Sequence, residues 1–364
     1  MKQRIHYNKL LLALLLLPTL IFANNTRLND AITTRERVIQ KTYNVSKDAT
    51  LKVSNKFGNV DIITWDKNTI ELDILIKVSG NDADKVEDRL ERIDVEFSAS
   101  RTLVSAITKI EKNSSNWWNW GKKMNLKLEI DYVIKLPITN AIDISNDFGS
   151  ISVDTLEGVA KINCDHGRIN TKELMADGNE LNFDHTKDSY FEYIKSGNIN
   201  ADFSSYTVAK TKNIIINGDH TSGHIEVAEN VTYNCDFNSL KIDNVNSIQG
   251  NADHLTLRIG NIFKNASVKS DFGTIKIEKI ASNAQNIEIN GEHASIILGY
   301  DSDYSFNFNI NLEHASLKNT DSFNFTKKRI NGSDKLYIGS YGSNSTQNQM
   351  KINSEFGSVT FKKQ

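Results

Sequence analysis

Six of the eight histidines occupy one recurring position of this sequence, and each directly follows an acidic residue. Imidazole and carboxylate groups are common zinc ligands, so neighbouring pairs such as His293 and His314 could chelate an ion with the adjacent acids. Phenylalanine, however, fills the same position in the other repeats. A column of metal ligands would not alternate with phenylalanine, whereas a stack of planar rings would. We therefore predict a structural ring column, with no metal and no cofactor, that consists of Phe148, His166, His185, Phe203, His220, Phe237, His254, Phe272, His293, His314 and Phe356.

The acidic residues that precede these rings form a second column, which we call the acid column. Carboxylates repeated at this spacing either make local hydrogen bonds at turns or collect cations. A calcium site needs about six to eight converging oxygen ligands, and the residue spacing of calcium-binding loops is absent. We therefore expect turn capping rather than calcium binding from Asp147, Asp165, Asp184, Asp202, Asp219, Asp236, Asp253, Asp271, Glu292, Glu313 and Glu355.

Residues that could carry out catalysis do not converge in the sequence. It contains no GxSxG, HExxH, P-loop or GxGxxG motif, and Arg168, Arg258 and Arg329 are far apart in the repeat. We therefore predict a protein that is not an enzyme. The alternatives are a carbohydrate-active β-helix enzyme and a periplasmic sensor or regulatory partner. The enzyme would require a groove where acidic and basic residues from several repeats converge.

A tryptophan-rich loop at 112–124 does not belong to the repeat. Trp117, Trp118 and Trp120 lie there among polar residues, next to Lys122 and Lys123. The rings either fold back onto the neighbouring strands or form an exposed platform for a glycan, a partner protein or a membrane interface. The loop is the candidate binding site from the sequence, and the adjacent lysines favour an anionic partner.

The repeat itself predicts the elements that position the rings. Ring positions follow one another at steps of 17 to 21 residues, with a last step of 42. Alternating apolar residues flank each ring and change parity behind it, as in Ile142 and Ile144 against Ile151 and Val153. This pattern predicts two strands joined at a corner, with the rings pointing into the core. The long last step suggests a degenerate coil near Asp334 and Lys335.

Units of this length without helical periodicity predict an all-β, parallel β-solenoid, right-handed by default, of about twelve coils over residues 141–364. Residues 24–140 differ, because they contain longer alternating segments and one short helical pattern. We expect an antiparallel, strand-rich cap there, with one isolated copy of the repeat at 49–64. The excess of asparagine favours left-handed corners and side-chain ladders.

Three segments, "NKFGNVDIITWDKN", "NDFGSISVDTLEG" and "NSEFGSVTF", resemble the bacterial putative adhesin family of secreted β-solenoids, which is related to the auto-transporter adhesin head domain. The resemblance covers most of the chain after residue 23. It implies the fold and export, and the family defines no functional residues that could be carried over. The corner glycine of the family is often missing here, as in "ADFSSYTV" and "CDFNSLKI".

The first 23 residues predict a signal peptide, because three basic residues precede a 14-residue apolar run that ends at Ala23. An uncleaved anchor is the alternative. Without this leader, 40 basic residues face 45 acidic ones, which argues against nucleic-acid binding. We expect an exported protein of the periplasm, the outer cell surface or the medium, whose partner is a glycan, an envelope protein or a membrane surface. Cys164 and Cys235 fall four coils apart, so we expect both thiols to be free.

Overall fold

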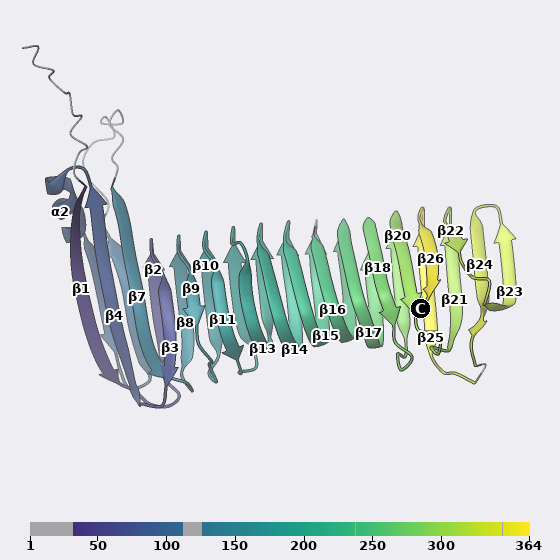
Figure 1. The fold of residues 1–364 in the computed structure, drawn as a ribbon, viewed down its shortest axis with the longest axis horizontal. Helices are drawn as coiled ribbons and strands as arrows, with labels where there is room; N and C mark the ends of the chain where they lie inside the picture. Colours follow the sequence, from purple (N-terminus) through teal and green to yellow (C-terminus); the bar gives the residue numbers. More distant parts are fainter. Residues whose placement is uncertain (1–31, 112–125, 237, 344) are drawn as a thin grey trace, which may run out of the picture.

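The computed structural model describes residues 32–111, 126–236, 238–343 and 345–364. These residues form one long sheet of 26 strands and a single helix, and the strands stand side by side in a row (Figure 1). We call two consecutive strand segments joined at one ring residue a repeat. The first end of the row consists of β1 (Thr33–Asn44), β4 (Thr69–Gly80), α2 (Ala83–Glu91), β5 (Ile93–Ala99), β6 (Leu103–Ile110) and β7 (Lys127–Pro137).

The middle of the row consists of parallel strands. We call the two strand segments of a repeat its first and second arm. Each of the longest strands contains the second arm of one repeat and the first arm of the next. The strands are β2 (Thr50–Lys56), β3 (Val60–Trp65), β8 (Ala141–Asp147), β9 (Ile151–Val153), β10 (Ala160–Asp165), β11 (Ile169–Leu174), β12 (Asn179–Asp184), β13 (Ser189–Asp202), β14 (Ser205–Asp219), β15 (Ser222–Asp236), β16 (Ser239–Asp253), β17 (Leu255–Ser270), β18 (Gly273–Ile280), β19 (Ile287–Glu292) and β20 (Ala294–Tyr300).

The second end of the row is built from the last strands of the chain. These are β21 (Phe306–Glu313), β22 (Ser316–Lys318), β23 (Asn324–Asn331), β24 (Asp334–Tyr341), β25 (Gln349–Glu355) and β26 (Ser358–Lys363).

Apolar residues on both sides of each corner are buried between the two arms of the repeats. Ile142 and Ile144 lie before the corner and Ile151 and Val153 after it, and none of these side chains is more than 2% exposed. The parallel register carries each inward position onto the same position of the next repeat, as in the pairing of Ile199 with Ile216. The stacked apolar columns thus form one continuous core along the row.

Asparagine side chains on the outer face of the strands form ladders of hydrogen bonds. Asn200 donates its side-chain amide to Asn182 at 2.6 Å, and Asn217 donates to Asn200 at 2.8 Å. These bonds join successive repeats and account structurally for the many asparagines. The side-chain ladders expected from the composition are therefore present.

The row begins with antiparallel strands. β7 pairs in parallel with β3 but antiparallel with β4, and β4 pairs antiparallel with β1. Helix α2 begins at the N-cap Asp82 and buries Val86 and Leu90 beside β1 and β4. The copy of the repeat formed by β2 and β3 is not isolated, because it pairs directly with β8 and β9.

The last repeat lies inside the row, which differs from the expected order. Strand β25 pairs in parallel with β19 on one side and with β21 on the other. The segment near Asp334 and Lys335 is therefore not a degenerate coil. It belongs to β24, which runs antiparallel to β21 and, with β23, forms a hairpin that covers this end (Figure 1). The 42-residue step reflects this detour of the chain.

Candidate functional site

The described rings at the corners form two stacked series along the row, one from Phe57 to His220 and one from His254 to His314. Centroids of neighbouring rings lie 4.8 Å apart between His166 and His185, 5.3 Å between His185 and Phe203, and 5.0 Å between Phe203 and His220. Interplanar angles in the stack range from 2° to 24°. The stack also includes Phe57, which is absent from the predicted column, and its position in the repeat is the signal that could have placed it there.

The rings point outward, so the predicted inward orientation is wrong. The described phenylalanines of the stack are 37–54% exposed, and the histidines are exposed as well. The physical reason is the backbone at the corner. Every described ring residue except Phe272 has a positive φ, between 47° and 64°, and this left-handed conformation turns the side chain out of the alternation of the preceding strand. At Phe272, the next residue, Gly273, has the positive φ instead.

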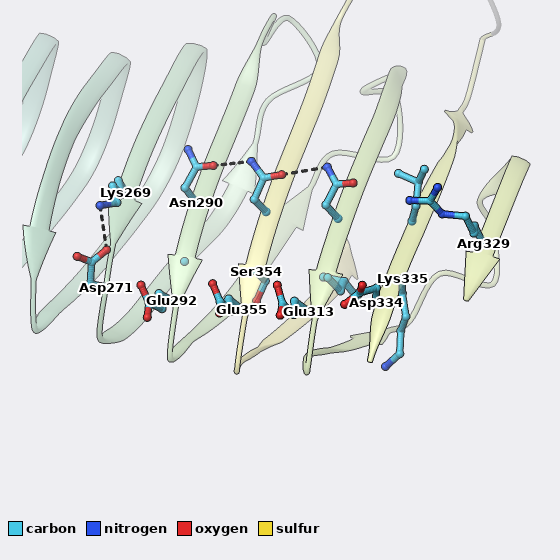
Figure 2. Close-up of a pocket in the computed structure, with 15 residues that line it drawn as sticks. Lys269, Asp271, Asn290, Glu292, Glu313, Arg329, Asp334, Lys335, Ser354 and Glu355 are labelled. Carbon is cyan, nitrogen blue, oxygen red and sulfur yellow. Dashed lines mark hydrogen bonds and ion pairs between the residues drawn. The ribbon is translucent and has the colours of Figure 1, made fainter. Parts of the chain in front are cut away.

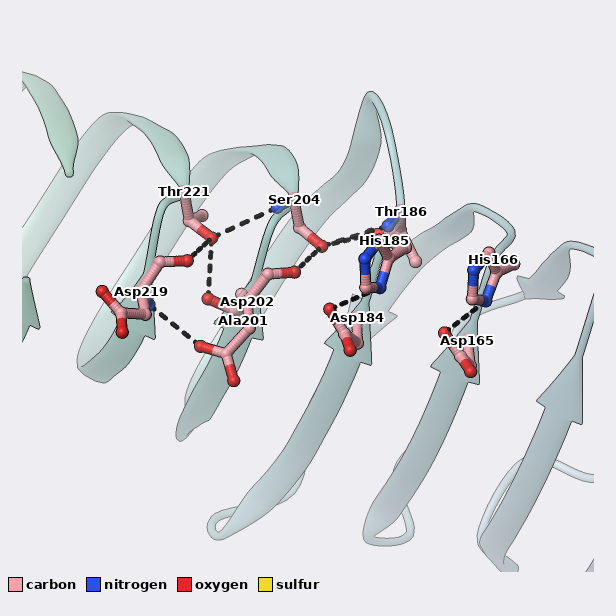
Figure 3. A network of polar contacts seen from close by, with 10 residues as sticks. All are labelled: Asp165, His166, Asp184, His185, Thr186, Ala201, Asp202, Ser204, Asp219 and Thr221. Atoms are coloured by element: carbon pink, nitrogen blue, oxygen red, sulfur yellow. Dashed lines mark hydrogen bonds and ion pairs between the residues drawn. The ribbon is translucent and has the colours of Figure 1, made fainter. Parts of the chain in front are cut away.

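Buried hydroxyl groups form hydrogen bonds with the backbone at the corners (Figure 3). Ser204 donates its hydroxyl to the carbonyl oxygen of Asp202 at 2.7 Å and accepts the backbone N–H of Thr186 at 3.1 Å. Thr221 likewise donates to the carbonyl oxygen of Ala201 at 2.7 Å. These bonds tie each corner to its neighbour and explain how a strained backbone conformation recurs along the stack.

Five histidines of the column contact the acids that precede them. Nδ1 of His166 lies 2.7 Å from a carboxylate oxygen of Asp165, and the corresponding distance between His185 and Asp184 is 2.9 Å (Figure 3). Other acids bond to the backbone, since the carboxylate of Asp202 accepts the N–H of Asp219 at 2.9 Å. This bond joins neighbouring strands rather than residues of one turn, so these acids link successive repeats and pair with histidine instead of capping their own turn as expected.

Asp165, His166 and His185 bring possible metal-ligand atoms within 4.8 Å of one another. The two imidazoles, however, are stacked with an interplanar angle of only 3°. Imidazole binds a metal through a lone pair in the plane of its ring, and two parallel planes at this separation cannot share an ion at a bond length of about 2.1 Å. The chelating pair considered from sequence, His293 and His314, is not adjacent, because Phe356 stacks between its members.

A second polar feature lies at the C-terminal end of the acid column. Glu292, Glu355 and Glu313 come from neighbouring strands in that order and point the same way (Figure 2). They line a hollow of about 400 Å³ together with Arg329 and Lys335. Within the described part of the chain, neither Glu355 nor Glu313 has an ion-pair partner. In this hollow, acidic residues from three repeats lie near basic residues of the β23–β24 hairpin.

Both cysteines are free and buried, as predicted. Burial, together with the charge of Asp165, raises the pKa of Cys164 to about 12, and burial also raises the pKa of Cys235. Burial therefore makes both thiols less ionised at neutral pH than a free cysteine.

Several candidate residues lie outside the described residues. These are Phe237 of the ring column and the whole tryptophan-rich loop, with Trp117, Trp118, Trp120, Lys122 and Lys123. The binding role of the loop remains a prediction from the sequence. Within the described ranges, no helix is long and apolar enough to span a bilayer.

No protein-family model and no curated protein matches the sequence. Among solved structures, the chain is similar to a putative adhesin from Bacteroides fragilis, with 14% identity, a TM-score of 0.26, and coverage of 90% of this chain and 97% of the other. It is also similar to a putative cell adhesion protein from Clostridium sporogenes, with 10% identity, a TM-score of 0.20 and coverage of 91% and 100%. A putative lipid binding protein from Parabacteroides distasonis has 8% identity, a TM-score of 0.29 and coverage of 89% and 96%. From likenesses at these values we draw nothing about family or function.

Proposed function

We propose that this protein is an exported β-solenoid of the bacterial envelope that acts as a non-enzymatic interaction or scaffold module, with adhesion as its role. In this proposal, residues 1–23 are a cleaved signal peptide and residues 24–140 cap the solenoid, which continues through 141–364. The parallel pairing at steps of 17 to 21 residues supports the solenoid. The sequence resemblance to secreted adhesin-like solenoids supports export.

The observation that carries the proposal is the outward-facing ring column. Phenylalanine is a poor choice for an exposed corner with positive φ, where glycine or asparagine would be less strained. Here phenylalanine stands at such corners with about half of its surface exposed, as at Phe148 and Phe203. Aromatic side chains that remain exposed in a line are a typical feature of contact surfaces. The column thus offers a rigid edge to a glycan, an envelope protein or a membrane surface.

The test combines location with binding. The intact gene product is expressed in its bacterial host, and mass spectrometry of the envelope fraction determines its first residue. The purified chain is then incubated with isolated envelope material, and the bound fraction is compared with that of a Phe148→Gly/Phe203→Gly variant. We expect processing after Ala23 and reduced binding by the variant. An unprocessed cytoplasmic protein, or equal binding by both chains, would contradict the proposal.

One observation favours the alternative of a carbohydrate-active enzyme, namely the hollow at Glu292, Glu355 and Glu313 with Arg329 nearby. In most glycoside hydrolases, however, one carboxyl group acts as the acid and a second acts as the base or nucleophile, so the two need different environments. The three carboxylates here project from one face of one sheet (Figure 2). Reducing-sugar release from envelope polysaccharides, lost in Glu355→Gln, would establish the enzyme, and no release by the wild-type chain would exclude it.

A further inference from the structure

A shallow groove of about 560 Å³ runs beside the ring column in the middle of the row. One wall consists of the rings of Phe203, His220 and His254. The other wall contains Ser222, Ser239 and Thr256, which pair in register on three neighbouring strands. The groove therefore crosses the strands and follows the long axis of the row, with a hydroxyl group at the same register position of three neighbouring strands.

The hydroxyl groups of this wall are available to a ligand. No described residue forms a hydrogen bond with the side chain of Ser222, Ser239 or Thr256, and all three are at least partly exposed. By contrast, the hydroxyls of the preceding residues are not available, because Ser204 and Thr221 donate to backbone carbonyl oxygens at the corners. A serine or threonine hydroxyl can both donate and accept, which suits a partner rich in hydroxyl groups.

The charge of the groove restricts the partner further. Lys187, at one end, is the only lysine, arginine or acidic residue among the described residues that line it. On the far side of the rings lies the acid column, with Asp202 and Asp219. An anionic polymer such as a nucleic acid or a polyuronate would lie beside this row of carboxylates and be repelled. The chemistry of the groove thus favours a neutral ligand.

We propose that this groove binds a neutral, linear polysaccharide that lies along the row, with about one sugar residue for each repeat. Neighbouring strands are spaced by about 4.8 Å, which is close to the advance per residue of an extended polysaccharide. Both faces of Phe203 are covered by His185 and His220, so its ring edge forms part of the apolar wall, and the serine and threonine hydroxyls bond the sugar. This inference rests on the proposed function and specifies its ligand.

Isothermal titration calorimetry of the purified chain tests the inference with cellohexaose, xylohexaose, mannohexaose and, as an anionic probe, polygalacturonate. We expect at least one neutral hexasaccharide to bind and polygalacturonate not to bind. The double variant Ser222→Glu/Ser239→Glu should weaken binding by about tenfold or more, because it places two carboxylates in the groove. The matched control Thr232→Glu/Gln249→Glu adds the same charges to the same two strands outside the groove and should bind like the wild type.

A second variant covers the case in which the glutamates disturb folding. Ser222→Ala/Ser239→Ala only removes two exposed hydroxyls, and the loss of two hydrogen bonds should again weaken binding by about tenfold. Equal affinity of this variant and the wild type would overturn the groove as the site. Failure of all neutral hexasaccharides to bind would overturn the ligand class. If the chain still binds envelope material through the ring column in that case, the proposed function stands and only this inference fails.

Discussion

At the residue scale, the ring column depends on side chains that the local backbone does not favour. A positive φ costs a residue with a Cβ about 1–2 kcal/mol, and the column places Phe or His there repeatedly. Stacking of each ring on two neighbours offsets part of this cost. The recurrence of the rings could be predicted from the sequence by their spacing. Their outward direction could not, because the alternation predicts the corner but not the positive φ of the ring residue, which turns its side chain outward.

The strain at the corner can be measured at Phe203. We expect Phe203→Ala to destabilise the protein, because it removes stacking while the Cβ keeps the strain of φ 48°. Phe203→Gly also removes the ring but relieves the strain, so it should be more stable than Phe203→Ala by about 1 kcal/mol. Denaturant unfolding of the two variants gives the difference. The reverse order would show that the corner is not strained.

The buried thiols supply a second prediction at this scale. Because the pKa of Cys164 is raised to about 12, its thiolate is scarce in the folded protein at neutral pH. We expect neither cysteine to react with Ellman's reagent in the native chain, and both to react after unfolding without a reductant. A native disulfide would appear as missing thiols and would contradict the register of the repeats.

At the scale of the elements, the position of the last repeat is the main departure from the sequence-based prediction. The motif of β25 and β26 predicts another repeat correctly, but a motif does not say between which neighbours it stacks. Asn353 of β25 bonds Asn290 of β19 at 2.6 Å and accepts from Asn311 of β21 at 3.0 Å. These long-range contacts, with the backbone pairing, place β25 inside the row, and the asparagine that recurs at this position in most repeats does not reveal the order in the sequence.

Engineered disulfides test this strand order. Asn353→Cys should form a disulfide with Asn290→Cys, and in a separate variant with Asn311→Cys, because these are neighbouring ladder positions. The pair Asn290→Cys/Asn311→Cys should not form one, since two strand spacings of about 4.8 Å exceed the limit of about 7 Å between Cα atoms. Non-reducing mass spectrometry distinguishes the three variants. Efficient formation of the third bridge would mean that β25 lies elsewhere.

The core of the repeats should dominate stability over the acid column. Ile289 on β19 is fully buried, so Ile289→Ala should cost about 2–5 kcal/mol. Asp271 forms a surface ion pair with Lys269 at 3.2 Å. The substitution Asp271→Asn should therefore lower the free energy of unfolding by less than about 1 kcal/mol. Urea titration of both variants makes the comparison. A larger loss for Asp271→Asn would indicate that the carboxylate has a role beyond its surface ion pair.

At the scale of the whole molecule, the row ends in strands that resist further pairing. Among the described strands, β1 pairs with β4 alone and β23 with β24 alone, and both carry charged residues such as Arg35, Lys41, Lys327 and Lys328. Charged edge strands oppose end-to-end association through added strand pairing. The all-β class and the repeat length could be predicted from the sequence, whereas the hairpin at the second end could not, because β23 and β24 lack the repeat motif.

Metal removal tests whether the long acid column needs cations. The stacked geometry of His166 and His185 does not suit a shared ion, so we expect the melting temperature to be the same with and without EDTA. A large drop in EDTA, restored by calcium but not by magnesium, would identify the acid column as a cation site.

The central claim is that the ring column is an exposed contact surface, and hydroxyl-radical footprinting tests it most directly. In the free chain we predict strong oxidation of Phe148, Phe203 and Phe356, which are 47–54% exposed. Addition of isolated envelope material should protect these rings, while Met175 and Tyr190, which are exposed outside the column, should react as before. Rings that are already unreactive in the free chain, or that stay equally reactive when the chain is bound, would contradict the claim.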